Sequence, residues 1–75
     1  MNPVQLAQVG TGDWGANLVR NFASLPEGKL ALLCDTDSQR LARAAKMAPG
    51  ARTTTDPEDV AKDASIEAVA IAASA

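Results

Sequence analysis

The chain has 75 residues and a formal net charge of −2, and 47% of its residues are hydrophobic although only 3% are aromatic. This length allows one small domain, whose core of mostly small side chains gains little free energy from each residue that it buries. The negative charge argues against nucleic acid or an anionic membrane as the main partner.

Residue types and segments that the sequence lacks argue against a metal site, a disulfide, a membrane span and a signal peptide. Histidine, the commonest metal ligand and acid–base group, is absent, and the single cysteine, Cys34, cannot form an internal disulfide. No apolar run is as long as a membrane span, and the amino terminus lacks the basic and apolar regions of a signal peptide. We therefore expect a cytoplasmic protein without a metal site.

The first predicted element is a strand over Val4–Val9, followed by a helix from about Thr11 or Asp13 to about Leu25. Gln8 departs from the apolar character expected of a parallel strand with both faces covered. Either its amide finds a partner at the end of the sheet, or the strand is less enclosed. We favour the first interpretation, because buried amides are usually satisfied.

Between this strand and helix lies a G-x-G-x-x-G motif, Gly10-Thr11-Gly12-Asp13-Trp14-Gly15. Gly10 permits a tight turn, Gly12 lets the backbone approach a pyrophosphate, and Gly15 lets the helix pack closely on the strand. The amino end of the helix would then face the anion. The alternative is a glycine turn that binds nothing, and Trp14 could equally contact a ligand or only cover the loop.

A second strand is predicted over Lys29–Cys34, and it ends at Asp35, 20 residues after Gly15. At this spacing a Rossmann unit places the carboxylate that binds ribose, so the glycine motif is interpreted as a dinucleotide site. Cys34 lies within an apolar run and is expected to be a core residue rather than a reactive thiol.

The rest of the chain continues the alternation of strands and helices. Cap residues from Asp37 precede a helix that continues to Met47, a short third strand follows over Ala51–Thr54, and Asp56 caps a brief helix with Pro57 at its first position. A fourth strand is expected over Ile66–Ala73. With right-handed crossovers, this order predicts an α/β fold in which residues 1–75 form one half-Rossmann domain, a parallel sheet of four strands in order 3-2-1-4 with three crossover helices.

The sequence resembles the amino-terminal half of the NAD(P)-binding domain of the Gfo/Idh/MocA family, which includes glucose-fructose oxidoreductase and inositol dehydrogenase. Four segments carry the resemblance, namely residues 9–17, 34–37 with Arg40, 53–56 and 69–72, so it extends over essentially the whole chain. It implies a nicotinamide dinucleotide as cofactor. Asp35 favours NAD, because an acid would repel the 2′-phosphate of NADP, although Arg40 leaves room for NADP.

The resemblance also implies roles for the matching residues. The backbone of Thr11, Asp13 and Trp14 would meet the pyrophosphate, within the turn shaped by Gly10, Gly12 and Gly15. Asp35 would bind the adenosine ribose, and Thr36 and Arg40 would flank the adenine. The residues after the fourth strand, Ala72, Ala73 and Ser74, would pass near the nicotinamide-side ribose, although the family usually has Thr-Pro in place of Ala73-Ser74.

Members of the family transfer hydride to or from a sugar, a sugar nucleotide or inositol. They continue to a Glu-Lys-Pro segment with the catalytic lysine and to a substrate domain with an acid–base histidine or tyrosine, and this chain contains neither histidine nor tyrosine. We therefore assign no catalytic residue and expect a half domain, cut from a longer oxidoreductase, that does not transfer hydride alone. Asp35→Ala is expected to weaken NAD binding more than folding, on the assumption that this carboxylate is exposed.

The alternative function is a self-associating Rossmann-like fragment, or scaffold, without significant nucleotide binding. Ile66–Ala72 contains few charges that would keep an exposed sheet edge from pairing with another chain. We therefore favour a homodimer over a monomer, formed through the fourth strand or by exchange of a terminal element.

Overall fold

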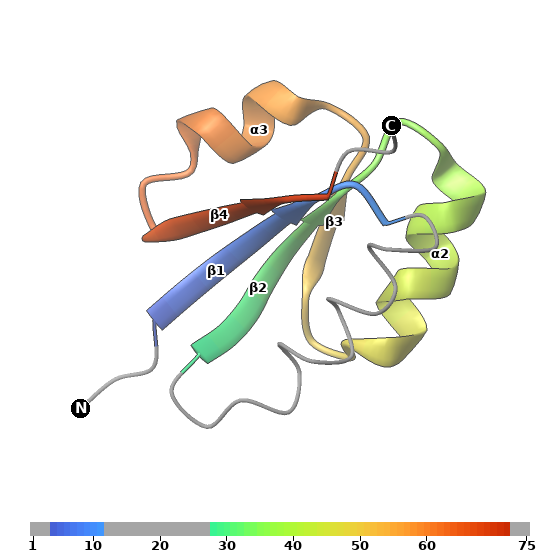
Figure 1. The fold of residues 1–75 in the computed structure, drawn as a ribbon, viewed down its shortest axis with the longest axis horizontal. Helices are drawn as coiled ribbons and strands as arrows, with labels where there is room; N and C mark the ends of the chain where they lie inside the picture. Colours follow the sequence, from blue (N-terminus) through green and yellow to red (C-terminus); the bar gives the residue numbers. More distant parts are fainter. Residues whose placement is uncertain (1–3, 12–27, 73–75) are drawn as a thin grey trace.

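The structure, a computed structural model, describes residues 4–11 and 28–72. Four parallel strands form one sheet in the order β3-β2-β1-β4, as predicted (Figure 1). The strands are β1 (Val4–Val9), β2 (Gly28–Cys34), β3 (Arg52–Thr54) and β4 (Ala68–Ile71). The helix predicted after the first strand lies outside the described residues.

Two helices are described, and both begin where the sequence predicts a cap. The side chain of Asp37 accepts hydrogen bonds from the N–H groups of Gln39 and Arg40 and so caps α2 (Ser38–Met47). Asp56 accepts from the N–H of Glu58 at the start of α3 (Pro57–Lys62). These contacts satisfy N–H groups that have no partner within the helix.

The fourth strand is shorter than predicted. Ile66 lies in the turn after α3, where its N–H donates to the carbonyl of Asp63, and the strand begins only at Ala68. The apolar run predicts a strand from Ile66, but Ile66 is still held in the turn by its hydrogen bond to Asp63, so the strand can begin only after it. Ala73, the other end of the predicted strand, lies outside the described residues.

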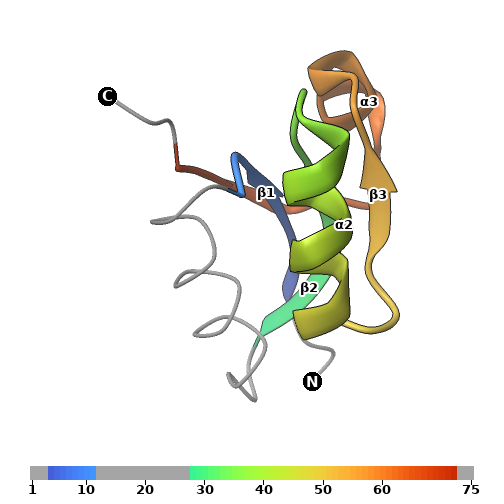
Figure 2. The same ribbon diagram turned by 90° about the vertical axis from the view of Figure 1, so that its right-hand side faces the viewer.

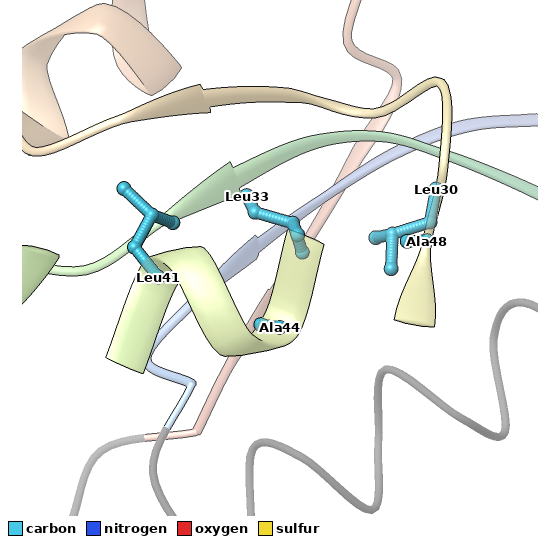
Figure 3. Close-up of a cluster of buried hydrophobic side chains, with 5 residues drawn as sticks. All are labelled: Leu30, Leu33, Leu41, Ala44 and Ala48. Carbon is cyan, nitrogen blue, oxygen red and sulfur yellow. The ribbon is translucent and has the colours of Figure 1, made fainter. Parts of the chain in front are cut away.

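A bulge in β2 places Leu30 and Leu33 on the same side of the sheet, toward α2. Leu6 pairs with Leu30 and Ala7 pairs with Leu32, so Ala31 is an extra residue on β2. Leu30 and Leu33 consequently share one cluster although they are three residues apart. Figure 3 shows this cluster, which is completed by Leu41 and Ala44 of α2 and by Ala48, the residue that follows α2. Figure 2 shows α2 lying along the sheet.

A second cluster joins β1 and β2 to α3. It contains Leu32 and Cys34, which alternate with Leu33 along β2, together with Ala7 and Val60. Cys34 is fully buried, and burial together with the negative charges of Asp35, Asp56 and Asp59 raises the pKa of its thiol. The expectation that Cys34 is a core residue is confirmed. With α2 on one face and α3 on the other, β2 is enclosed and its carboxyl end is held in place.

Among the described residues, no helix has the length and apolar character needed to cross a membrane. The same part of the chain contains no group of three or more His, Cys, Asp or Glu side chains that could hold a metal ion.

Candidate functional site

The carboxyl ends of β1, β2 and β4 lie in register. Val9 pairs with Cys34 on one side and with Ile71 on the other, so the residues that follow them, Gly10, Asp35 and Ala72, meet at one edge of the sheet. The N–H of Gly10 donates to the carbonyl of Cys34 at 2.8 Å, and the N–H of Ala72 donates to the carbonyl of Val9, also at 2.8 Å. In open α/β sheets this edge is where ligands bind.

Gly10 closes the turn after β1. Its φ of +95° lies in the region that favours glycine, and a Cβ at this position would stand 2.3 Å from the carbonyl oxygen of Ala72. The side chain of Gln8 is fully buried and its Nε2 donates to the carbonyl of Gly10 at 2.9 Å, so its amide does find a partner at the end of the sheet. Only a residue without a side chain can therefore occupy this meeting point of β1 and β4.

Asp35 is bound directly to this glycine turn. Its Oδ2 accepts hydrogen bonds from the N–H of Thr11 at 2.8 Å and from the Thr11 hydroxyl at 2.7 Å, and its Oδ1 accepts from the N–H of Asp37 at 2.8 Å. Both partners are buried, with Asp35 9% exposed and Thr11 4% exposed. The turn and the acid, 24 residues apart in sequence, thus form one hydrogen-bonded unit.

The environment keeps Asp35 ionised. Burial by itself raises the pKa of this carboxyl, but the hydrogen bonds from Asp37 and Thr11 and the positive charge of Arg40 together hold the pKa below its usual value. Hydrogen bonds to the charged form favour that form, which explains the direction. The site therefore presents a desolvated negative charge at neutral pH.

The assumption that Asp35 is exposed is wrong. The carboxylate is buried because Thr11 and Asp37 donate to it from both sides. Its removal would leave buried N–H groups without an acceptor, which destabilises a fold. Asp35→Ala must therefore be expected to weaken the fold as well as any ligand contact.

The other described residues of the predicted site lie outside this buried unit. Thr36 is exposed, and Nε of Arg40 lies 3.6 Å from Oδ2 of Asp37, with half of each side chain exposed. Arg40 is thus held at the amino end of α2, one turn after Asp35. Six further predicted residues lie outside the described part of the chain: Gly12, Asp13, Trp14, Gly15, Ala73 and Ser74.

Two contacts were missed by reasoning from the sequence. The sequence predicts only a helix cap at Asp37, but the N–H of Asp37 also orients Asp35, and the spacing Asp-x-Asp after a strand is the signal that indicates this. For Thr11 only a backbone role was expected, whereas its hydroxyl also binds Asp35. No local pattern reports a contact that depends on the pairing of β1 with β2.

These features define a class: half of a doubly wound α/β fold, with a glycine turn and an acid at adjacent strand ends. The chain is 35% identical over 71 residues to inositol 2-dehydrogenase 2 of Paenarthrobacter aurescens (strain TC1), covering 93% of this chain and 21% of that protein. No protein-family model matches it.

The fold is also similar to solved structures of dehydrogenases and related proteins. The fold matches myo-inositol 2-dehydrogenase from Lactobacillus plantarum with a TM-score of 0.87 and 27% identity, over 97% of this chain and 22% of that one. It matches GenD2 from gentamicin A biosynthesis, solved in complex with NAD, with a TM-score of 0.86 and 25% identity, over 97% of this chain and 21% of that one.

The chain spans about a fifth of the length of these relatives. The resemblance to the amino-terminal, nucleotide-binding half of Gfo/Idh/MocA-type dehydrogenases is thereby confirmed, as is the half-Rossmann fold.

Proposed function

We propose that this chain is a dinucleotide-binding half-domain that takes NAD at the carboxyl edge of its sheet. The observation that carries the proposal is the unit formed by Gly10, Thr11 and Asp35, because it unites a glycine turn with an ionised acid on the neighbouring strand. The NAD complex of GenD2, whose fold this chain shares, supports a nicotinamide dinucleotide as the ligand.

The described residues suit the ribose of such a ligand. Gly10 lets the carbonyl of Ala72 lie close against the turn after β1, and Oδ1 of Asp35 accepts one hydrogen bond from Asp37 and has a further acceptor position for a ribose hydroxyl. The pyrophosphate contacts assigned to Gly12, Asp13, Trp14 and Gly15, and the nicotinamide-side contacts assigned to Ala72, Ala73 and Ser74, stay predictions from the motif.

The charge of Asp35 favours NAD over NADP. A 2′-phosphate would stand beside a buried carboxylate that the surrounding hydrogen bonds keep ionised, and like charges repel strongly where water is excluded. Arg40, whose guanidinium is held by Asp37, is the cation nearest in sequence that could offset this repulsion. We therefore expect NADP to bind more weakly than NAD.

When bound, NAD supplies a hydride acceptor, and the proposed role of this chain is to bind and orient the adenosine and pyrophosphate half of it. By analogy with inositol 2-dehydrogenase, the reaction served is oxidation of inositol or a related polyol, within a longer polypeptide. We assign no catalytic residue to this chain and expect no hydride transfer by it alone. Its location in the cytoplasm stays a prediction from the sequence.

The proposal is tested by calorimetric titration of the chain with NAD and NADP. Asp35→Asn removes a charge-assisted hydrogen bond and should weaken NAD binding by about ten-fold or more. Glu58→Gln is the matched control, because it removes one negative charge from an exposed helix residue whose partner is Lys62. Circular dichroism establishes that each variant is folded before titration.

If titration with NAD produces no heat and leaves the fluorescence of Trp14 unchanged, the dinucleotide proposal is wrong and the scaffold alternative is favoured.

Self-association is the second behaviour that we propose, and exposed apolar side chains on β4 favour it. Val69 is 48% exposed and Ile71 is 71% exposed, on a strand that pairs with β1 on its other side. Pairing of β4 with the same strand of a second copy would satisfy the backbone groups on its outer edge and bring these apolar side chains beside those of the partner strand. Light scattering over a range of concentrations tests this, because a constant mass of 7.7 kDa would exclude the homodimer.

A further inference from the structure

The carboxylate of Asp35 has little hydrogen-bonding capacity left for a ligand. A carboxylate offers about four acceptor positions, two on each oxygen. The N–H and the hydroxyl of Thr11 fill both positions of Oδ2, and the N–H of Asp37 fills one position of Oδ1. One position, on Oδ1, remains.

The Thr11 hydroxyl is not easily displaced from Oδ2. A ribose hydroxyl that replaced it would form one hydrogen bond and break an equivalent one, so the number of bonds would not increase. Thr11 is a buried residue, so its hydroxyl would be left without water or an acceptor, which is costly. The exchange is therefore unfavourable.

We propose that Thr11 determines how this site recognises ribose: its hydroxyl closes Oδ2, so that Asp35 accepts a hydrogen bond from only one hydroxyl of the vicinal diol, through Oδ1. This inference rests on the proposed function and makes it more specific. The adenosine ribose is recognised through a single hydroxyl at Asp35, and loss of the other hydroxyl is tolerated. Thr11 thus sets the specificity of the acid without contacting the ligand through its own side chain.

The test uses calorimetric titration of the whole chain with ADP, 2′-deoxy-ADP and 3′-deoxy-ADP, which carry only the adenosine-side ribose. For the wild-type chain, loss of one hydroxyl should weaken binding about ten-fold, as expected for a hydrogen bond to a charged group, and loss of the other less than about three-fold. Equal effects of the two deletions, whether large or absent, overturn the inference and leave the proposed function in place. If the wild-type chain binds neither ADP nor NAD, the proposed function is wrong and the inference falls with it.

Two substitutions separate the hydroxyl from the rest of the residue. Thr11→Ala removes the hydroxyl together with the methyl group and so opens the second position on Oδ2, so both deoxy analogues should then bind several-fold more weakly than ADP. Thr11→Ser keeps the hydroxyl and should reproduce the wild-type asymmetry. An asymmetry that persists unchanged in a folded Thr11→Ala variant contradicts the inference.

A measurement on the ligand-free chain accompanies these titrations. The Thr11 hydroxyl stabilises the ionised form of Asp35, so the titration midpoint of this carboxyl, followed by carbon NMR, should rise in Thr11→Ala and stay at the wild-type value in Thr11→Ser. A midpoint that does not move in the alanine variant shows that the hydroxyl does not hold Oδ2 and overturns the inference. Because the wild-type comparison of deoxy analogues needs no substitution, the inference stays testable even if Thr11→Ala fails to fold.

Discussion

β2 and β4 are both apolar strands, but the fold treats them in opposite ways. Every residue of β2 from Leu30 to Cys34 is buried, whereas Val69 and Ile71 of β4 are largely exposed. β2 lies between β1 and β3, with α2 and α3 covering its faces, while β4 pairs only with β1 in the described part of the chain (Figure 1). Position in the sheet, and not hydrophobicity alone, therefore decides which apolar strand becomes core.

The two strands also differ in what their carboxyl ends contribute. β2 is followed directly by Asp35, which is buried, charged and hydrogen-bonded to Thr11 and Asp37. β4 is followed by Ala72, which contributes backbone to the meeting point with Gly10. We infer that β2 carries most of the stability and the polar part of the site, and that β4 is free to make contacts with another chain.

The largest predicted effect is that of truncating the core of β2. Leu33→Ala should lower the free energy of unfolding by about 2–5 kcal/mol, because Leu33 is fully buried against α2 and its loss leaves a cavity. Val69→Ala on β4 is the control and should change it by no more than about 0.5 kcal/mol. Urea denaturation followed by circular dichroism measures both; similar losses in the two variants would show that β4 is as enclosed as β2.

The next effect concerns the contact between the ends of β1 and β4. Alanine at Gly10 or at Gly50 must adopt a positive φ, which costs about 1–2 kcal/mol in either case. At Gly10 the new methyl group also meets the Ala72 carbonyl, whereas at Gly50 no atom lies within 4 Å. The free energy of unfolding of Gly10→Ala should therefore be lower than that of Gly50→Ala by about 1–3 kcal/mol.

Hydrogen exchange gives an independent measure of the same contact. If Gly10→Ala separates the strand ends, the Ala72 N–H loses its bond to Val9 and should exchange faster than in Gly50→Ala. Equal stability and equal exchange in the two variants would mean that the end of β4 does not lie against Gly10.

The third effect is the dependence of stability on pH that Asp35 gives to the end of β2. Because its pKa is lowered in the folded state, Asp35 stabilises the fold fully above its unfolded pKa of about 3.9, and this contribution is lost as pH falls through the folded pKa. At pH 7, Asp35→Asn should cost about 1–3 kcal/mol, and the difference from wild type should shrink below about pH 4.

Denaturation curves at a series of pH values measure this difference. Subtracting the profile of Asp35→Asn from that of the wild type removes the contribution of Asp63, whose pKa is also lowered, chiefly by hydrogen bonds from Ser65. A difference between the two profiles that stays constant from neutral to acid pH would contradict the assignment.

The smallest effect on stability is expected on β4, where the effect on association should be large. Ile71→Lys places a charge on an exposed side chain, so the unfolding free energy of the monomer should change by no more than about 0.5 kcal/mol. A lysine on an edge strand opposes pairing with a second chain, so the dimer should dissociate. Val4→Lys on β1 is the matched control, since Val4 is 41% exposed but lies on a different strand.

Sedimentation velocity distinguishes these outcomes. A wild-type chain that dimerises, with Ile71→Lys monomeric and Val4→Lys still dimeric, is the expected result. Dissociation by both substitutions, or by neither, would show that β4 is not the interface.

Much of the fold was predictable because its signals are local. The caps at Asp37 and Asp56 depend on residues within three positions in the sequence, and the burial of Cys34 follows from the apolar run around it. The strand order follows from the alternation of elements and the handedness of crossovers. In the site, the positions of Gly10 and Asp35 follow from the motif spacing, but the burial of Asp35 does not, because it depends on groups donated by another strand.

The sequence by itself determined the element types, the sheet order and the residues that end β1 and β2, since each depends on neighbours within a few residues or on a general topological rule. The tertiary structure alone decided that Ala31 bulges, that the Thr11 hydroxyl fills Oδ2 of Asp35, and that Ile71 stays exposed while Leu33 is buried. Each of these depends on register between strands or on packing of helices against the sheet. Such contacts join residues far apart in the chain, and no local pattern of side chains records them.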